Sequence, residues 1–192
     1  AAGQLSKGCI SNYSSVQENV QEAKVELDRY RKAGFMVDVK KSTVTDEMKH
    51  GTISKLGLII KHKPEGIKRR IILDLRRSGG NKKATLPEKL VLPRPRDFLN
   101  SIRSVYAMQR AHGRDEGYAR ELAVIDVSDA FMSLAVEEKE LVHTLAPNIE
   151  NEDFYMFVAL LFGYKTAPLL WSRVAALLSR LLQSAEIGRA HV

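Results

Sequence analysis

The chain has 192 residues, with 30 Lys and Arg against 23 Asp and Glu, which gives a formal net charge of +7. This length allows a buried core. A single cysteine excludes a disulfide framework, and the five histidines show no metal-ligand spacing. No signal peptide or transmembrane segment is visible. We therefore expect an intracellular protein, cytoplasmic or nuclear, that does not contact a membrane.

The first predicted element is a helix that begins near Ser14. Ser14 is a suitable N-cap, and a capping-box partner follows it in the same turn. Apolar residues then recur every three or four positions until Gly34 ends the pattern. These residues are Val16, Val20, Ala23, Leu27 and Tyr30. We predict one amphipathic helix that docks on the elements after it.

The next predicted element is a hairpin with a basic tip. Residues 56–61 and 70–75 are rich in β-branched and apolar side chains, and the segment between them contains Pro64 and Gly66, which favour a turn. The window 61–83 holds nine basic and two acidic residues, so it accounts for the whole net charge. Such a cluster is typical of a phosphate-binding face, although a solvated charge run would have the same composition.

Prolines and a polar stretch separate this hairpin from the rest of the chain. Pro87, Pro93 and Pro95 indicate a connector, and residues 109–120 read as a polar, glycine-containing loop.

A short apolar run, 122–125, predicts a buried strand that ends at Asp126. A carboxylate at that point favours a bound cation, and Mg²⁺ there could hold a nucleotide triphosphate for phosphoryl transfer. Taken alone, Asp126 is more typical of a residue that caps the turn after a strand, because Asp is common at such points.

The last predicted elements are a strand and a helix. Residues 154–161 form an apolar and aromatic run with strand character, Gly163 interrupts it, and Pro168 suits the first turn of a helix. Apolar residues recur at helical spacing over 168–184, with a narrow polar side. This pattern predicts a mostly buried helix.

Two segments resemble the palm motifs of reverse transcriptases from retroviruses and LTR retrotransposons. One is Ala-Val-Ile-Asp-Val-Ser-Asp-Ala-Phe, residues 123–131, and the other is Phe-Gly-Tyr-Lys-Thr-Ala-Pro, residues 162–168. The second departs from the common retrotransposon form, because Leu161 replaces a proline. The resemblance covers roughly residues 55–184 and implies an α+β right-hand polymerase fold, with fingers and a partial palm.

The first motif carries most of the implied chemistry. By resemblance, Asp126 is the first metal-binding carboxylate and Val127 adds a backbone carbonyl ligand, with two Mg²⁺ ions in the complete enzyme. Asp129 and Ala130 match the turn whose N–H groups bind the triphosphate. Phe131 matches the aromatic ring beneath the sugar, which leaves no room for a 2'-hydroxyl and implies a preference for deoxynucleotides.

The resemblance also assigns roles outside that motif. Lys63 and Arg70 have the seven-residue spacing of the phosphate-binding pair on the fingers hairpin. Arg76, in Asp-Leu-Arg, matches a residue that contacts the template backbone. Phe162 and Gly163 match residues that border the nucleotide and template pocket.

The implied organisation has four parts. Residues 1–54 form the N-terminal helical part of the fingers, 55–100 the fingers hairpin and connector, and 101–186 a partial palm with the first two motifs. Residues 187–192 match the in-frame translation of a common sequencing adapter, so we expect them to be non-native; the alternative is an ordinary polar C-terminus. The family's third motif, Tyr-x-Asp-Asp, does not occur in the sequence. We therefore expect a truncated chain that is inactive alone.

The resemblance implies an RNA-directed DNA polymerase from a retroelement polyprotein. Its partners would be an RNA or DNA template with a primer, deoxynucleoside triphosphates, and the remaining thumb, RNase H and integrase parts of the polyprotein. One alternative is a catalytically dead, polymerase-like module that binds nucleic acid. Another is a primer-independent RNA polymerase, which Phe131 disfavours because its ring would obstruct a ribonucleotide.

Overall fold

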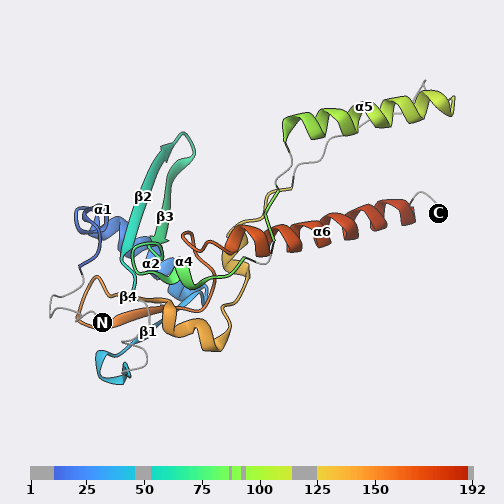
Figure 1. The fold of residues 1–192 in the computed structure, drawn as a ribbon. Coiled ribbons are helices and arrows are strands. Elements are labelled where there is room, and N and C mark those ends of the chain that lie inside the picture. The colour runs from blue at the N-terminus through green and yellow to red at the C-terminus, as the bar shows by residue number, and fades with distance from the viewer. Residues whose placement is uncertain (1–10, 46–52, 87, 92–93, 114–124, 190–192) are drawn as a thin grey trace. The chain divides into compact units, whose positions relative to one another are not determined.

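The computed structural model is a mixed α+β structure with two small antiparallel sheets (Figure 1). It describes residues 11–45, 53–86, 88–91, 94–113 and 125–189. The chain divides into two compact units. The first comprises Ala1–Leu86 and Asp129–Val192, and the second comprises Pro87–Ser128.

The N-terminal part of the first unit contains two helices, α1 (Ser14–Gln17) and α2 (Val20–Lys32). The prediction of one helix was wrong, because the chain leaves helical geometry at Asn19, where φ is −127° and ψ is 47°. The expected capping box is also absent: Tyr13 is the N-cap, without a side-chain capping bond. Gly34 ends the second helix as predicted, with a positive φ of 74°.

Both helices dock on a hairpin, as the apolar periodicity predicted. Helix α1 packs against β2 (Leu56–Lys63), and α2 packs against β3 (Gly66–Leu73). The buried face of α2 carries Ala23, Leu27 and Tyr30. Since a short helix is marginal in isolation, this apolar face is what holds α2 in place.

The predicted hairpin is confirmed, and its strands extend further toward the tip than the sequence indicated. Leu56 pairs with Leu73 and Lys63 pairs with Gly66, so the turn contains only two residues. Because successive side chains alternate between the two faces of a strand, one face carries apolar residues near its base: Leu56, Leu58, Ile71 and Leu73. The opposite face carries four cations: Lys61, Lys63, Lys68 and Arg70.

A second sheet has the strand order β1-β5-β4, with β1 (Met36–Val39), β4 (Leu145–Pro147) and β5 (Phe154–Phe157). The predicted strand at 154–161 is confirmed for its first half. The second half is an irregular segment with isolated bridges, in which Ala159 pairs with Ala135 and Phe162 pairs with Ile72.

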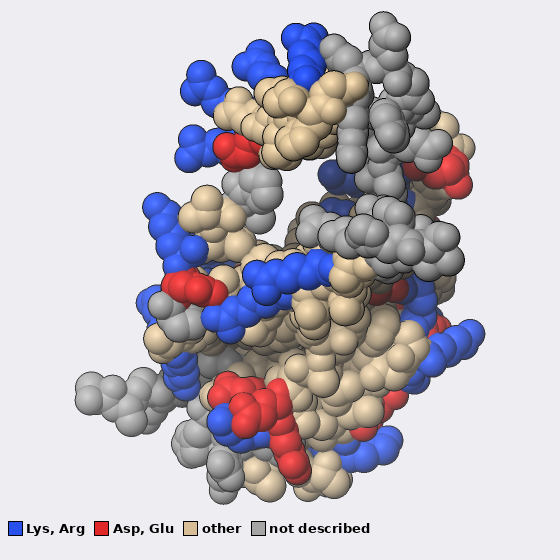
Figure 2. All heavy atoms as spheres, turned by 90° about the vertical axis from the view of Figure 1, so that its right-hand side faces the viewer, with Lys and Arg blue, Asp and Glu red and all other residues tan. Residues whose placement is uncertain are grey.

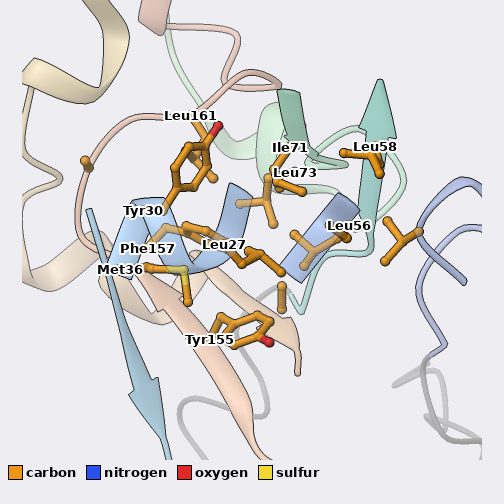
Figure 3. Close-up of a cluster of buried hydrophobic side chains, with 14 of the residues drawn as sticks. Leu27, Tyr30, Met36, Leu56, Leu58, Ile71, Leu73, Tyr155, Phe157 and Leu161 are labelled. Carbon is orange, nitrogen blue, oxygen red and sulfur yellow. The ribbon is translucent and has the colours of Figure 1, made fainter. Parts of the chain in front are cut away.

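One apolar core joins α2, the base of the hairpin and the second sheet (Figure 3). Its largest fully buried side chains include Tyr30, Tyr155 and Phe157, one from α2 and two from β5. Burial of a large apolar side chain contributes about 1.5–3 kcal/mol. This core therefore fixes β3 beside the segment that leads to Phe162.

Short helical turns complete the first unit before its long C-terminal helix. They are η1 (Lys41–Thr43), α4 (Gly80–Lys83), η2 (Ala130–Ser133) and η3 (Glu138–His143). Helix α6 (Ala167–Arg189) contains Pro168 near its start, as predicted. Among the helices that the structure describes, none is long and apolar enough to cross a membrane.

The prediction that this last helix is mostly buried was wrong. Ala167 and Leu169 are buried in its first turn, but five later leucines are exposed: Leu170, Leu177, Leu178, Leu181 and Leu182. Helix α6 contacts η2 and then extends away from the sheets of its unit (Figure 1). Apolar periodicity gives the face that a helix can bury, but not the partner that would cover it.

The second unit contains α5 (Pro95–Ala111), which the sequence analysis missed. Pro95 occupies the first helical turn, and the carboxylate of Asp97 accepts a hydrogen bond from the backbone N–H of Arg94 at 2.8 Å. The loop predicted at 109–120 therefore begins later than expected; residues 114–120 lie outside the described part of the chain. Pro87, Pro93 and residues 122–124 of the predicted strand also lie outside it. Ile125, the last residue of that run, is not in a strand.

Candidate functional site

The segment that contains Phe162 and Gly163 is fixed to strand β3. The backbone N–H of Leu73 donates to the carbonyl oxygen of Phe162 at 3.0 Å. Gly163 has a positive φ of 118°, and a Cβ atom at this position would lie 2.0 Å from the carbonyl oxygen of Leu73. Only glycine fits so close to another backbone. This glycine thus lets the segment lie directly against the base of the hairpin.

Asn81, from α4, holds the same segment from the other side. Its Nδ2 donates to the carbonyl oxygen of Gly163 at 2.8 Å, and its Oδ1 accepts from the backbone N–H of Lys165 at 2.9 Å. Both functions of the amide are therefore engaged by the backbone of one loop. No local pattern in the sequence indicates this role of Asn81, because its two partners lie 82 and 84 positions away.

Three of the residues expected to bind nucleotide meet in one cluster. The guanidinium carbon of Arg70 lies 5.0 Å from the ring centroid of Phe162, within cation–π range. The rings of Phe162 and Phe131 lie 5.4 Å apart at an interplanar angle of 62°, an edge-to-face contact. These residues come from β3, the segment after β5, and η2. The structure therefore places them together although they are far apart in the sequence.

Asp129 begins the turn that carries Phe131, and an ion pair fixes its side chain. Its φ is +52°, a left-handed conformation that is uncommon for a residue other than glycine. Arg29 binds both carboxylate oxygens of Asp129, at 2.6 and 3.1 Å. Arg29 also binds both oxygens of Glu26, at 2.8 and 3.2 Å, and lies 4.9 Å from the ring centroid of Tyr30.

These contacts form what we call the Arg29 cluster: Glu26, Arg29 and Asp129. The hydrogen bonds that the Arg29 guanidinium donates to Glu26 and then to Asp129 raise its pKa, so its charge is permanent. Since the carboxylate of Asp129 is engaged by Arg29, what this residue can offer a ligand is its backbone. One local signal for this cluster is present in the sequence, the three-residue spacing of Glu26 and Arg29 on a helix. Nothing in the sequence indicated the partner on the distant turn.

Ala130 follows in η2, and local hydrogen bonds define the turn around it. The backbone N–H of Ser133 donates to the carbonyl oxygen of Asp129 at 3.1 Å, and the hydroxyl of Ser133 donates to that of Ala130 at 2.7 Å. Ala130 and Phe131 are half-buried. The turn is therefore held by its own backbone and by the Arg29 cluster.

Lys63 lies at the hairpin tip, away from the cluster of Arg70, Phe162 and Phe131. It pairs with Gly66, whereas Arg70 pairs with Ile59, four residues further from the turn. At about 3.3 Å per residue, this separates the two positions by roughly 13 Å along the strand. The ammonium of Lys63 lies 3.3 Å from the carboxylate of Glu65, and its side chain is exposed. Lys63 and Arg70, which were expected to act as a pair, thus lie on the same face of the hairpin but at different positions along its strands.

Arg76 lines a pocket at the base of the hairpin. The pocket has a volume of about 390 Å³, and its lining includes Tyr13, Ile72, Asp74, Asn81 and Gly163. The Asp74 carboxylate accepts from the backbone N–H groups of Arg76 and Arg77 at 3.1 and 2.9 Å and from the hydroxyl of Tyr13. Burial alone would raise the pKa of Asp74, but these hydrogen bonds outweigh it and lower the pKa. The carboxylate thus fixes the backbone that presents the Arg76 side chain.

The four cations on one face of the hairpin point away from the face that packs against helix α2. Arg69 points to the opposite face, where it forms an ion pair with Glu22 of α2. The side chains of Lys61, Lys68 and Arg70 share the face of Lys63. On the side of the molecule drawn in Figure 2, Lys and Arg gather in several groups, and Asp and Glu in fewer. A cationic face with separated charges suits an extended phosphate backbone.

Asp126 and Val127 belong to the second unit, as exposed residues outside any helix or strand. A carboxylate and a backbone carbonyl are hard oxygen ligands of the kind that Mg²⁺ prefers. Within the described residues, no group of three or more His, Cys, Asp or Glu could hold a metal ion. The donor set is therefore chemically suitable for magnesium but too small for a two-ion centre.

Comparison with known proteins gives no independent assignment. No protein-family model matches the chain, and a search of curated proteins finds no match.

Proposed function

We propose that this chain supplies the fingers and part of the palm of an RNA-directed DNA polymerase, which transfers nucleotides from deoxynucleoside triphosphates to the 3' hydroxyl of a primer. Support comes from the two palm motifs in the sequence and from the geometry of their residues. The α+β architecture, with a hairpin packed on a helix beside a small antiparallel sheet, is compatible with this proposal.

The observation that carries the proposal is the meeting of Arg70, Phe162 and Phe131. The resemblance gives these residues complementary tasks around one nucleotide: a cation for phosphate, a border for the pocket, and a ring beneath the sugar. A chance match of short motifs would not require these three side chains to touch.

Each residue has a physical role in this proposal. Arg70 offers a planar guanidinium that can bind two phosphate oxygens at once, whereas Lys63 at the tip is a mobile point charge. Phe131 occupies the space that a 2'-hydroxyl would need. Asp126 and Val127 would hold Mg²⁺, which supplies charge neutralisation at the phosphates and activation of the primer hydroxyl when bound.

The template would lie along the cationic hairpin face and the pocket that contains Arg76. The four cations of that face, together with Arg76, offer sequence-independent contacts to phosphates. Either an RNA or a DNA template fits this kind of contact. Other parts of a retroelement polyprotein would supply the thumb, the RNase H and the integrase.

A nucleic-acid-binding module without catalysis is a second candidate. One observation favours it: the cationic face of the hairpin can bind phosphates without a metal centre. This candidate predicts binding of template and primer without synthesis in any longer form of the protein.

Primer extension distinguishes the two candidates. The test uses a polymerase that contains this chain together with a Tyr-x-Asp-Asp motif, an RNA template, a DNA primer, deoxynucleotides and Mg²⁺. We expect synthesis that Asp126→Asn abolishes while template binding stays nearly unchanged, because this change removes a metal ligand and no phosphate contact. Asp28→Asn, at a surface residue that pairs with Arg31, is the matched control and should retain synthesis. Template binding without synthesis by the unmodified protein would favour the binding module instead.

A further inference from the structure

A single ring, that of Phe162, contacts both residues that are expected to select the nucleotide. Its centroid lies 5.0 Å from the guanidinium carbon of Arg70 and 5.4 Å from the centroid of Phe131. Arg70 and Phe131 belong to different elements, β3 and η2. Phe162 is therefore the physical link between the phosphate-binding strand and the ring beneath the sugar.

A hydrogen bond and a β-bridge attach the backbone of Phe162 to strand β3. Its carbonyl oxygen accepts from Leu73, and it forms a parallel bridge with Ile72, two residues beyond Arg70 on the same strand. The next residue, Gly163, is in contact with the backbone of Leu73 and is bonded to Asn81. The backbone that carries the Phe162 ring is thus fixed to β3.

We infer that Phe162 is a positioning residue that sets sugar selection and phosphate capture together. This inference rests on the proposed polymerase function and deepens it. Phe162 holds the Phe131 ring against lateral movement, so that the ring stays where it excludes a 2'-hydroxyl. The same ring holds the Arg70 guanidinium in one orientation before the triphosphate arrives, which lowers the cost of ordering it on binding.

Phe131 lies in a four-residue 3₁₀ turn, which gives its ring little support from its own element. Loss of the edge-to-face contact would free the ring to turn away from the sugar. Such a contact is worth enough to shift the ratio of two competing substrates by roughly 2- to 10-fold. A purely structural role for Phe162 would lower stability but leave this ratio unchanged.

The chain offers a matched control at another aromatic pair. Tyr30 and Phe35 also meet edge-to-face, with centroids 6.1 Å apart and an interplanar angle of 70°. Phe35 contacts the core but neither Arg70 nor Phe131 is its ring partner. Phe35→Leu therefore removes a comparable contact away from the candidate site. Phe162→Tyr keeps the ring and serves as the conservative variant.

The first arm of the test uses the 192-residue chain and needs no polymerase activity. Phenylglyoxal modifies accessible arginine side chains, and peptide mass spectrometry gives the rate of modification at Arg70. We expect Phe162→Leu to raise this rate several-fold relative to Arg76, with no change in Phe35→Leu and little change in Phe162→Tyr. An unchanged rate at Arg70 in Phe162→Leu would overturn the claim that the ring holds this guanidinium.

The second arm uses the polymerase that contains this chain and measures kcat/KM for a deoxynucleotide and for the matching ribonucleotide. We expect Phe162→Leu to lower the preference for the deoxynucleotide by roughly 2- to 10-fold. Phe162→Tyr should retain most of this preference, and Phe35→Leu should leave it unaltered. Phe131→Val should lower it further, and addition of Phe162→Leu to that variant should have little extra effect, because the ring to be positioned is gone.

The outcomes distinguish failure of the positioning role of Phe162 from failure of the proposed polymerase function. Synthesis with an unaltered preference in Phe162→Leu would overturn the positioning role and leave the polymerase assignment intact. A loss of preference in Phe35→Leu as large as that in Phe162→Leu would also overturn it, because general loosening would then explain both. Absence of synthesis by the unmodified polymerase would overturn the proposed function itself.

Discussion

Arg29 on helix α2 and Asp129 before η2 form an ion pair with two hydrogen bonds, at 2.6 and 3.1 Å. The same guanidinium binds Glu26, whose side chain is only 9% exposed. Through this pair, helix α2 is attached to the turn that carries Phe131. The left-handed conformation of Asp129 is therefore maintained by a contact from outside its own segment.

The Arg29–Asp129 pair should contribute measurably to stability. We expect a double-mutant cycle of Arg29→Met and Asp129→Asn to give a coupling energy of about 0.5–1.5 kcal/mol, because the pair is bidentate and only partly exposed. Urea denaturation followed by circular dichroism provides the free energies of unfolding. The matched control is Lys41 with Glu152, an ion pair at 2.7 Å whose side chains are 62% and 83% exposed. Its coupling should lie near zero, and equal coupling for the two pairs would contradict the prediction.

Gly163 should tolerate no side chain. Gly163→Ala combines a backbone conformation that favours glycine with a Cβ atom 2.0 Å from the Leu73 carbonyl oxygen, and backbone cannot move aside as a side chain can. We expect a loss of more than about 2 kcal/mol in the free energy of unfolding. Gly34→Ala is the control: its φ is also positive, at 74°, but no atom lies within 4 Å of the added Cβ. The loss there should be about 1 kcal/mol, and similar losses at both sites would exclude a close approach at Gly163.

The stability of the chain should depend on acid through Asp74. Its pKa is lowered below the ordinary value of 3.8 in the folded chain, because hydrogen bonds from Tyr13 and two backbone N–H groups outweigh burial. A lowered pKa stabilises the folded state above pH 3.8, and this contribution disappears as the pH falls through the lower folded value. Tyr13→Phe should therefore flatten the decline of unfolding free energy with falling pH in that range.

Tyr155→Phe is the control for this pH dependence. The Tyr155 hydroxyl donates to the amide oxygen of Asn148 at 2.9 Å, so its removal affects no carboxylate. Both variants should lose some stability at neutral pH. Only Tyr13→Phe should alter the acid limb of the profile, and parallel acid limbs for Tyr13→Phe and the unmodified chain would contradict the role of this hydrogen bond.

The sequence predicted elements whose signal is local and repeated. The hairpin was found because β-rich runs flank a Pro and Gly turn, and α6 because Pro168 precedes a long apolar period. The sequence did not show that Arg70, Phe162 and Phe131 would meet, although Phe131 and Phe162 lie in the two segments that resemble palm motifs. Their meeting depends on Gly163, whose close approach to Leu73 is a tertiary contact that a single glycine in a sequence does not reveal.

The missed features depend on long-range contacts or on competing local signals. Helix α5 was hidden because Pro95 indicated a connector, although proline is equally suited to the first turn of a helix. The break at Asn19 preserves the apolar period on both sides, so periodicity alone could not show it. The Arg29–Asp129 pair joins residues separated by 100 positions, and nothing local to either one predicts the other.

The two faces of the hairpin provide a sharp test of nucleic-acid binding. Lys68 and Arg69 are adjacent in β3 but point to opposite faces: Lys68 shares the cationic face with Arg70, whereas Arg69 pairs with Glu22 of α2. If the cationic face contacts phosphates, Lys68→Ala should weaken binding of an RNA–DNA duplex. Each lost phosphate contact should also reduce the slope of log affinity against log salt by about 0.7 to 0.9.

Arg76→Ala should have the same effect, because Arg76 is exposed at the pocket beneath the hairpin. Arg69→Ala removes an equal charge from the chain and should leave the slope unaltered, since its guanidinium faces the helix. Lys63→Ala and Arg70→Ala should impair capture of the nucleotide in the complete polymerase more than they impair duplex affinity. Filter binding of the 192-residue chain over a series of salt concentrations measures the slopes. A slope that responds equally to Lys68→Ala and Arg69→Ala would mean that net charge, and not a particular face, determines binding, and a flat salt dependence would mean that the hairpin cations are only a solvated surface.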